Sequence, residues 1–543
     1  MTPSTTKPAG IIYLTNKQSG VIYAYENHAY WDKEKKQSRS KRICIGKVDP
    51  GTGAIVPTRK KKHTSLVKQP PATRGPVPCH IVKHSFYGAT YLFDAIGSKL
   101  GITADLKACF PDTYKAILSI AYFLILEENN SLLRFEKWGA THKHPWGQDI
   151  PSQLSSRIFQ HISEESKLDF FRRQGRRRSE TEYWAYDIST ISSFSECLQQ
   201  VQYGLNKEHD HLPQFNLALL FGETSNLPFG YRILPGNMPD VKTVKQLIAE
   251  LDVYGIHKVK LAMDRGFYSE DNINALYHNH IKFLLAARTS LCLIQDALRT
   301  VHDTLPTYPH YDENFEIYAT TVRGTWLYKE QQPYTGRTKK ANRRLYIHVY
   351  YSVERAMEEQ KKMEHTITKL RHELTDGKRV PAHEKAYQKY FIIKITPVRG
   401  TKIMVREDVL KKQSYSYGYF ALISNEAMDA MTALKIYRNR DVVEKAFGNI
   451  KERLNFRRAL VSSELSLKGK VFVEFIALIY LSYIKKQMQD HNLFKKYTLQ
   501  GLLDKLDVVE AYEYPERELH CSELLEAQKV IYASMGVDPP PSL

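Results

Sequence analysis

Strand-like and helix-like segments alternate through the middle of the chain, and this alternation constrains the fold more than any other feature. The run begins with a strand predicted at Tyr183–Thr190, which has Asp187 near its centre. Two further strands are predicted at Asn216–Phe221 and Phe229–Pro235, with a turn between them. The pattern predicts a mixed α/β sheet. The run is completed by a helix at Val241–Tyr254, a strand at Lys258–Asp264, a helix at about 270–278 and a strand at Ile281–Ala287.

A second group of strand-like runs interrupts this sheet. Strands are predicted at Phe315–Val322 and Arg344–Tyr351, and a charged helix follows from Val353 to about Thr375. A strand at Gly418–Ser424 then returns the chain to the sheet and leads into further helices. The organisation that we expect is an α/β core at 181–289 and 416–490, divided by a β-rich insertion at 290–415.

Three further regions lie outside the predicted core. Residues 1–75 read as a small β-rich module, because strand-like runs flank Gly20. Residues 86–180 are predicted to be helical, and a glycine turn between two helices at Gly101 is compatible with a DNA-binding helix-turn-helix or with an ordinary helical bundle. Residues 491–543 are predicted to form a C-terminal helical tail.

The charge of the chain favours a polyanionic partner. The 543 residues carry 78 Lys and Arg against 59 Asp and Glu, a formal net charge of +19. Nucleic acid is the simplest such partner, although ribosomal and membrane-surface proteins are basic too. A chain of this length is also expected to form two to four domains.

Cysteine usage and hydropathy point to the cytoplasm. Six cysteines are scattered without a CxxC pair, which supports neither a disulfide framework nor a zinc ribbon. We find no signal peptide, and the most apolar run, Val471–Ile484, is short and contains Glu474. We therefore expect a cytoplasmic protein, associated with the bacterial nucleoid if DNA is its partner.

Dense basic runs occur at three places in the first 180 residues. They are Trp31–Arg42, Arg59–His63 and Phe171–Arg178, the last with five cations in eight residues. Each is compatible with contacts to a phosphate backbone, and each is also compatible with a solvated loop or linker.

Three carboxylates stand out in or near the core. Asp187 lies within an apolar strand and Asp264 ends another, and a carboxylate in such a place is costly unless it is paired or binds a metal ion. Glu444 lies on a helix predicted at Tyr437–Lys451, which has no proline. On that helix Tyr437, Arg440, Glu444 and Lys451 are predicted to share an arc of roughly 60°, beside an apolar face. Turn capping and surface ion pairs are the simpler interpretations of each acid taken alone.

The motifs around these acids resemble those of DDE transposases of bacterial insertion sequences. The likeness rests on Asp187-Ile-Ser-Thr, on Asp264-Arg-Gly-Phe, and on Tyr437, Arg440, Glu444 and Lys451 with the spacings of the Y-R-E-K signature. It covers about 183–488, and no sharp motif precedes it. The resemblance implies an RNase H-like catalytic core with an insertion between the second Asp and the Glu.

The resemblance also implies functions for these residues. Asp187, Asp264 and Glu444 would be the catalytic and metal ligands for two Mg²⁺ ions, which Mn²⁺ would be able to replace. The implied activity is cleavage at the inverted-repeat ends of a transposon and transfer of the 3′ ends into target double-stranded DNA, by a homodimer that pairs two ends. By the same resemblance Tyr437, Arg440 and Lys451 would contact DNA, while Arg265 would touch DNA or brace the site.

Two other hypotheses stay open. The chain could be a catalytically inactive, transposase-derived DNA-binding protein, although the presence of all three acids argues against it. It could also be another RNase H-like nuclease, for example one acting on branched DNA. The Y-R-E-K spacing and the insertion argue against that hypothesis.

Overall fold

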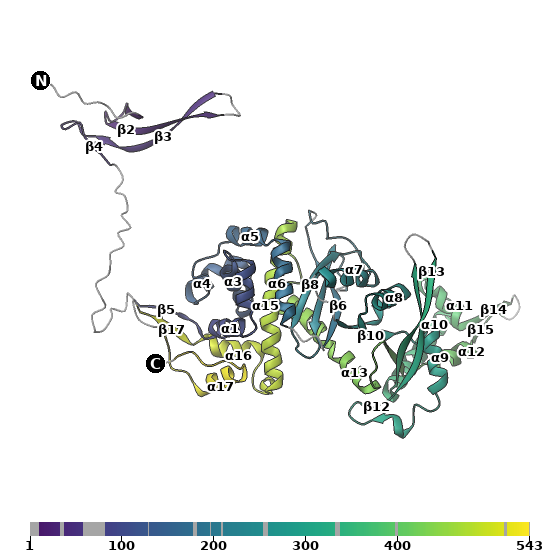
Figure 1. Ribbon diagram of the computed structural model, residues 1–543. Coiled ribbons are helices and arrows are strands. Elements are labelled where there is room, and N and C mark those ends of the chain that lie inside the picture. The colour runs from purple at the N-terminus through teal and green to yellow at the C-terminus, as the bar shows by residue number, and fades with distance from the viewer. Residues whose placement is uncertain are drawn as a thin grey trace. The chain divides into compact units, whose positions relative to one another are not determined.

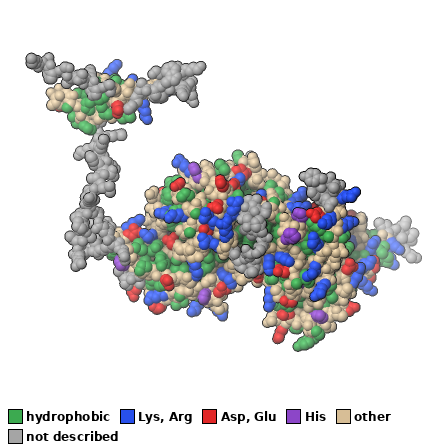
Figure 2. Space-filling model, in the orientation of Figure 1, with side chains coloured by type: hydrophobic (Ala, Val, Ile, Leu, Met, Phe, Trp, Pro, Cys, Tyr) green, Lys and Arg blue, Asp and Glu red, His purple; other side chains and the backbone are tan. Residues whose placement is uncertain are grey.

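The computed structural model divides the chain into two compact units, Met1–Pro76 and Val77–Leu543. It describes residues 10–32, 37–57, 82–128, 130–177, 182–195, 197–207, 210–253, 259–331, 337–396, 400–514 and 519–541. The basic tract at 59–63 and the end of the run at 171–178 therefore lie outside the described residues. Figure 2 shows lysine and arginine side chains spread over the visible face of the larger unit, with acidic side chains between them.

The N-terminal unit is an antiparallel sheet of four strands in the order β1-β2-β3-β4. The longest pair registers Tyr23 with Lys47 at one end and Asp32 with Gln37 at the other, so the described residues of the basic run at Trp31–Arg42 belong to the paired strands of a hairpin. Ala24 is the one buried apolar side chain among the described residues of this unit. The strands are β1 (Ile11–Thr15), β2 (Ile22–Asp32), β3 (Gln37–Val48) and β4 (Ile55–Val56).

A sheet of nine strands organises the larger unit (Figure 1). Its order is β11-β12-β13-β16-β10-β9-β6-β7-β8. The strands β6, β7 and β8 form an antiparallel meander, while β9 and β10 run parallel to β6. The mixed α/β sheet expected from the sequence is thus present. The strands of this half are β6 (Tyr183–Ser192), β7 (Gln214–Gly222), β8 (Pro228–Pro235), β9 (Lys260–Met263) and β10 (Lys282–Ala287).

Helices cover both faces of this sheet and enclose a hydrophobic core on each face. The side chains of β7 show how the sheet separates these two cores. Leu217 and Leu219 belong to one core and Ala218 and Leu220 to the other, as the two-residue period of a strand requires. The second core is closed by α7 (Asp240–Val253), α8 (Glu270–His278) and α9 (Cys292–Val301). The first is closed by α14 (Asp441–Gly448), α15 (Glu464–Asp490) and α6 (Glu164–Arg176).

The buried helix α15 joins the sheet to the helical region that precedes it in sequence (Figure 1). It contacts α3 and α5 on the helical side and β8 in the sheet. The predicted helical region at 86–180 contains α1 (Gly88–Lys99), α2 (Ile102–Cys109), α3 (Tyr114–Leu126), α4 (Phe135–Thr141), α5 (Ser152–His161) and α6. After α15 come α16 (Leu499–Asp507), α17 (Glu526–Ser534) and two short strands, β17 (Glu510–Glu513) and β18 (His520–Cys521). These strands form a three-stranded sheet with β5 (Lys83–Phe86), in which β17 lies between β18 and β5.

The segment predicted as an insertion contributes to two parts of the unit. The hairpin of β12 (Ile317–Gln331) and β13 (Thr338–Tyr351) extends the large sheet through β16 (Tyr419–Ser424), and β11 (Tyr311–Asp312) forms its edge. A small separate core surrounds Leu370, Tyr387 and Phe391. That core is built from α10 (Val353–Thr375), α11 (Glu384–Tyr390), α12 (Glu407–Ser414), β14 (Phe391–Thr396) and β15 (Gly400–Val405).

The single helix predicted at Tyr437–Lys451 is wrong. The chain forms α13 (Ala430–Asn439), turns at Arg440, continues as α14 and ends in a π-helical turn, η6 (Asn449–Arg453). At the junction the amide of Val443 donates to the carbonyl of Arg440, a tighter i to i+3 bond. Tertiary contacts of the Arg440 side chain fix this break, which no proline or glycine signals.

The described part of the chain contains no helix with both the length and the apolar composition needed to cross a membrane.

Candidate active site

The register of two parallel strands places the two aspartates side by side. Tyr186 of β6 pairs with Met263, the last residue of β9. Asp187 follows Tyr186 within β6, and Asp264 follows Met263 directly after β9. Ala185 and Ala262, two residues earlier, face the helices α13 to α15. Because side chains alternate along a strand, both carboxylates face that same helical layer.

The Arg440 guanidinium lies between two of the three acids. Its Nη1 is 3.4 Å from Asp187 Oδ2 and its Nη2 is 3.0 Å from Glu444 Oε1. Only 11% of the Arg440 side chain is exposed, and its Nε is buried without a hydrogen-bond partner among the described residues. Burial opposes the charge of Arg440, but electrostatic attraction to Tyr437, Asp187, Asp264 and Glu444 leaves its pKa raised.

Tyr437 connects the same group to the second aspartate. Its hydroxyl donates to Asp264 Oδ1 at 2.8 Å, and the Arg440 guanidinium carbon lies 5.2 Å from the centre of its ring. Burial, reinforced by the negative charge of Asp264, raises the pKa of the Tyr437 hydroxyl well above its usual range. The phenol therefore stays a hydrogen-bond donor to Asp264 at neutral pH.

Glu444 and Lys451 differ in exposure, although the sequence predicted that they share one arc of a single helix. The Glu444 side chain is 55% exposed, whereas Lys451 is buried and its ammonium donates to Ser189 Oγ at 2.8 Å. The π-helical turn between them explains the difference, because its wider turn rotates the residues that follow α14. Lys451 therefore reaches the strand that holds Asp187, two residues beyond it.

Arg265 takes a different position from these residues. It begins the short 3₁₀ turn η3 (Arg265–Phe267) directly after Asp264, and it is exposed. The structure thus brings Asp187, Asp264, Glu444, Tyr437 and Arg440 into one connected group, with Lys451 on the neighbouring Ser189. Arg265 adds a cation at the edge of that group.

The burial of Asp187 makes the ionised form of a lone carboxylate energetically unfavourable. Only 17% of its side chain is exposed, and desolvation raises the pKa of Asp187. The amide of Ile188, the Lys207 ammonium and the Arg440 guanidinium oppose this shift, while Glu444 adds to it. A nearby cation is therefore needed to keep Asp187 ionised at little cost.

The three acids match a divalent cation in chemistry but do not form a finished ligand group. Carboxylate oxygens are the donors that Mg²⁺ prefers. Among the described residues, however, no three His, Cys, Asp or Glu side chains lie together in a group that could hold a metal ion. The Arg440 guanidinium stands between Asp187 and Glu444, and its orphaned Nε shows that the buried site is incompletely satisfied.

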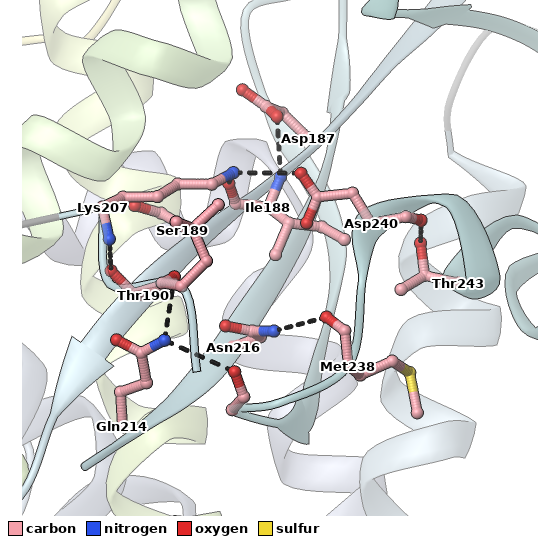
Figure 3. Close-up of polar contacts among 12 residues, drawn as sticks. Asp187, Ile188, Ser189, Thr190, Lys207, Gln214, Asn216, Met238, Asp240 and Thr243 are labelled. Carbon is pink, nitrogen blue, oxygen red and sulfur yellow. Dashed lines mark hydrogen bonds and ion pairs between the residues drawn. The ribbon is translucent and has the colours of Figure 1, made fainter. Parts of the chain in front are cut away.

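Two polar residues of the site had no signal in the sequence, Lys207 and Asp240. Figure 3 shows the Lys207 ammonium beside the strand of Asp187, where it donates to the Ile188 carbonyl at 2.6 Å and to Asp240 Oδ2 at 3.2 Å. Lys207 lies in an irregular connection between β6 and β7, and Asp240 is the first residue of α7. Neither position belongs to a spaced motif, so only tertiary structure reveals their place.

One of three comparisons with known proteins returns a family that covers more than half of the chain. The search of curated proteins returned no match. A solved structure of the piggyBac transposase synaptic complex with hairpin DNA is similar over 76% of this chain and 70% of that one, with 10% identity and a TM-score of 0.34. A likeness at that score supports no conclusion about this chain. The family described as the transposase DDE domain matches residues 185–480, more than half of the sequence. The chain therefore belongs to the transposase DDE domain family.

Proposed function

We propose that this protein is an active DNA transposase that cuts the inverted-repeat ends of its own element and joins the 3′ ends to target DNA. The observation that supports this most strongly is the Arg440 guanidinium, which interacts with Asp187, Glu444 and Asp264 together. Three carboxylates from a strand, a strand end and a helix have no structural need to converge on one buried cation. A buried carboxyl with a raised pKa beside a charged partner, as Asp187 is beside Arg440, is typical of functional sites.

We further propose an RNase H-like core. The order β8-β7-β6-β9-β10 supports it, with an antiparallel meander followed by two strands parallel to the first. Asp187 lies in the first strand and Asp264 follows the fourth, so both reach one edge from adjacent strands. The domain limits expected from the sequence, including the core at 181–289 and 416–490, are part of the same proposal.

In this proposal Asp187, Asp264 and Glu444 hold two divalent ions, Mg²⁺ with Mn²⁺ as a substitute. The family generally uses divalent metals. When bound, such ions polarise the scissile phosphate and stabilise the attacking and leaving oxygens. The chain supplies the positions: β6 and β9 fix the two aspartates, and α14 brings Glu444 to the same face. Water is the first nucleophile, and a DNA 3′-hydroxyl is the second.

Tyr437, Arg440, Lys451 and Arg265 are proposed to contact DNA. Tyr437 and Arg440 now bind the catalytic acids, so in the proposal they exchange these partners for phosphates when metal ions neutralise the carboxylates. The exposed position of Arg265 beside Asp264 supports a direct DNA contact. We assign the protein to the Y-R-E-K subgroup of bacterial insertion sequences, working as a homodimer on DNA in the cytoplasm.

The alternative is a transposase-derived DNA-binding protein without catalysis. One observation favours it: the described residues contain no ready group of three metal ligands. The two proposals differ in a single measurable property, which is metal-dependent cleavage.

The test is cleavage of a labelled duplex that carries the inverted repeat flanking the gene. With Mg²⁺ the wild-type protein should nick the duplex at the repeat boundary, and EDTA should stop the reaction. Glu444→Ala should bind the duplex normally and lose cleavage, by a factor of at least about 10³ for loss of a metal ligand. Asp441→Ala, which changes an acid on the same helix that pairs with Lys445, is the control and should cleave. Cleavage by Glu444→Ala would contradict the assigned site, and binding without cleavage by the wild type would favour the alternative.

A further inference from the structure

Lys207 is held against the strand of Asp187 by both its backbone and its side chain. Its amide donates to Thr190 Oγ1 at 3.2 Å, and its ammonium donates to the carbonyl of Ile188 at 2.6 Å (Figure 3). Ile188 is the residue after Asp187 on β6. The lysine is thus anchored within one residue of the proposed metal ligand, although it comes from an otherwise irregular connection.

Asp240 provides the second contact of this ammonium, at 3.2 Å. Asp240 begins α7, which packs on the face of the sheet opposite to α14. Its Oδ2 also lies 3.9 Å from the position that a Cβ atom of Gly266 would occupy, so it reaches the turn that follows Asp264. Lys207 and Asp240 therefore border both aspartates from the helical layer that Arg440 does not occupy.

The Lys207 ammonium has room for another acceptor. An ammonium carries three N–H donors, and the contacts that the Lys207 ammonium makes with described residues, to Ile188 and Asp240, use two of them. The side chain is 37% exposed, so the remaining donor can meet a ligand from solvent.

We infer that Lys207 is a DNA-contacting residue that binds a phosphate adjacent to the scissile one, and that Asp240 holds it in position before DNA arrives. An ammonium on a strand edge that also presents two metal-binding carboxylates would stand beside any phosphate bound there. Together with Arg440 it gives the site one cation from each helical layer. The inference rests on the proposed function, because it takes DNA as the ligand.

The test measures how the binding of the terminal-repeat duplex depends on salt, in EDTA so that no cleavage occurs. Removing one phosphate contact lowers the slope of log affinity against log salt by about 1. Lys207→Ala should show this loss and also cleave at least about tenfold more slowly with Mg²⁺. Lys207→Arg should restore the slope, because a guanidinium also binds phosphate.

Lys245→Ala is the matched control. Lys245 lies on α7 and forms an ion pair of the same length, 3.2 Å, but with the exposed Asp271. Its removal subtracts the same charge and should leave the slope and the cleavage rate unchanged. Equal losses in Lys207→Ala and Lys245→Ala would mean that only net charge matters, and would overturn the inference.

The Asp240→Asn variant distinguishes the positioning of Lys207 by Asp240 from the binding of phosphate by Lys207. The amide cannot form the ion pair, so Lys207 keeps its charge but loses the contact that holds it in position. Cleavage with Mg²⁺ should therefore slow toward the rate of Lys207→Ala, while the slope stays at the wild-type value. Wild-type cleavage by Asp240→Asn would overturn the role given to Asp240. Wild-type slope and cleavage in Lys207→Ala would overturn the role of Lys207 while the proposed function stands. If the wild type binds the duplex without cleaving it, the catalytic proposal is contradicted, but the slope comparison still decides the role of Lys207. If the wild type does not bind the duplex, both the proposed function and the role of Lys207 are overturned.

Discussion

At the scale of single residues, the site depends on the sharing of one buried cation among carboxylates. Arg440 contacts Asp187 and Glu444, while Tyr437 holds Asp264. The choice of the two aspartates was accessible from the sequence, because each is an acid in or directly after an apolar strand. The hydrogen-bond partners of these acids could not be predicted from the sequence. The spacing of Tyr437 and Arg440 does not show which acid each side chain contacts, because that depends on the register between β6 and β9.

A buried histidine makes a prediction at this scale. His348 on β13 has no exposed surface, and burial lowers its pKa from 6.5 to about 4. The unfolded chain therefore takes up a proton at this residue as pH falls below about 6.5, whereas the folded protein does so only near 4. The free energy of unfolding should fall by about 3 kcal/mol over that interval on account of His348.

Urea unfolding of the wild type and of His348→Asn at pH 7 and pH 4.5 tests this expectation. The variant should be less stable at pH 7, because it leaves space in the core, and should lose less stability on acidification. His144 gives the control: burial lowers its pKa to about 4 as well, so the variant should keep part of the acid sensitivity. An identical pH dependence in wild type and variant would contradict the role given to His348.

At the scale of elements, the sequence predicted what periodicity and turn residues can signal. The strands from β6 to β10 and the helices α7, α8 and α10 lie where the patterns placed them, apart from small shifts at their ends. The break at Arg440 and the π-helical turn η6 were missed, because neither contains a proline and the only glycine, Gly448, is the last residue of α14. Both are imposed by contacts that the chain makes with a distant strand, which local propensity cannot register.

The contact between η6 and β6 yields a prediction for these two elements. The ammonium of Lys451, which is buried, donates to Ser189 Oγ. Ser189→Ala removes one acceptor from a buried charge and should lower the free energy of unfolding by about 1–3 kcal/mol. Lys451→Met removes the charge itself, so adding Ser189→Ala to it should cost much less.

A double-mutant cycle by urea unfolding measures this coupling. Thr432→Ala, at an exposed helix start where the hydroxyl bonds Asp429, gives a comparison outside the site. It should add independently to Lys451→Met, because the Thr432 hydroxyl donates to Asp429 at the start of α13. Independent costs for Ser189→Ala and Lys451→Met would show that their hydrogen bond does not couple η6 to the strand.

At the scale of the whole molecule, charge and hydrophobic core are divided unequally between the two units. Residues 1–76 contain 15 Lys and Arg against 4 Asp and Glu, a net charge of +11 out of the +19 of the chain. All buried residues of the four hydrophobic cores, in contrast, come from the larger unit. The smaller unit therefore adds little to stability and much to attraction for a polyanion.

Removal of residues 1–76 should separate these two properties. The shortened chain should unfold at nearly the same temperature, within about 2 °C, because no hydrophobic core is lost. Its affinity for duplex DNA should be lower, and the dependence of that affinity on salt should be shallower by several units of slope. Calorimetry and binding at several salt concentrations check the two parts.

A full-length chain in which Arg39, Lys41 and Arg42 are changed to glutamine is the companion variant. These exposed cations lie on β3, so it should show a smaller loss of the same kind without any truncation. A change of the same number of exposed lysines on α10, Lys361, Lys362 and Lys369, controls for net charge. Full DNA affinity without residues 1–76 would show that the larger unit binds DNA unaided.

The position of α15 late in the sequence also determines when the helical core can form during translation. Helices α1 to α6 need this helix to complete their core, yet more than 330 residues separate the end of α3 at Leu126 from the start of α15 at Glu464. At ribosomal rates of about 5–20 residues per second, the early helices wait roughly 20 to 70 s with their apolar surfaces uncovered. During that time these apolar surfaces are available for aggregation, and the group of residues around Arg440 cannot form before Glu444 has been synthesised.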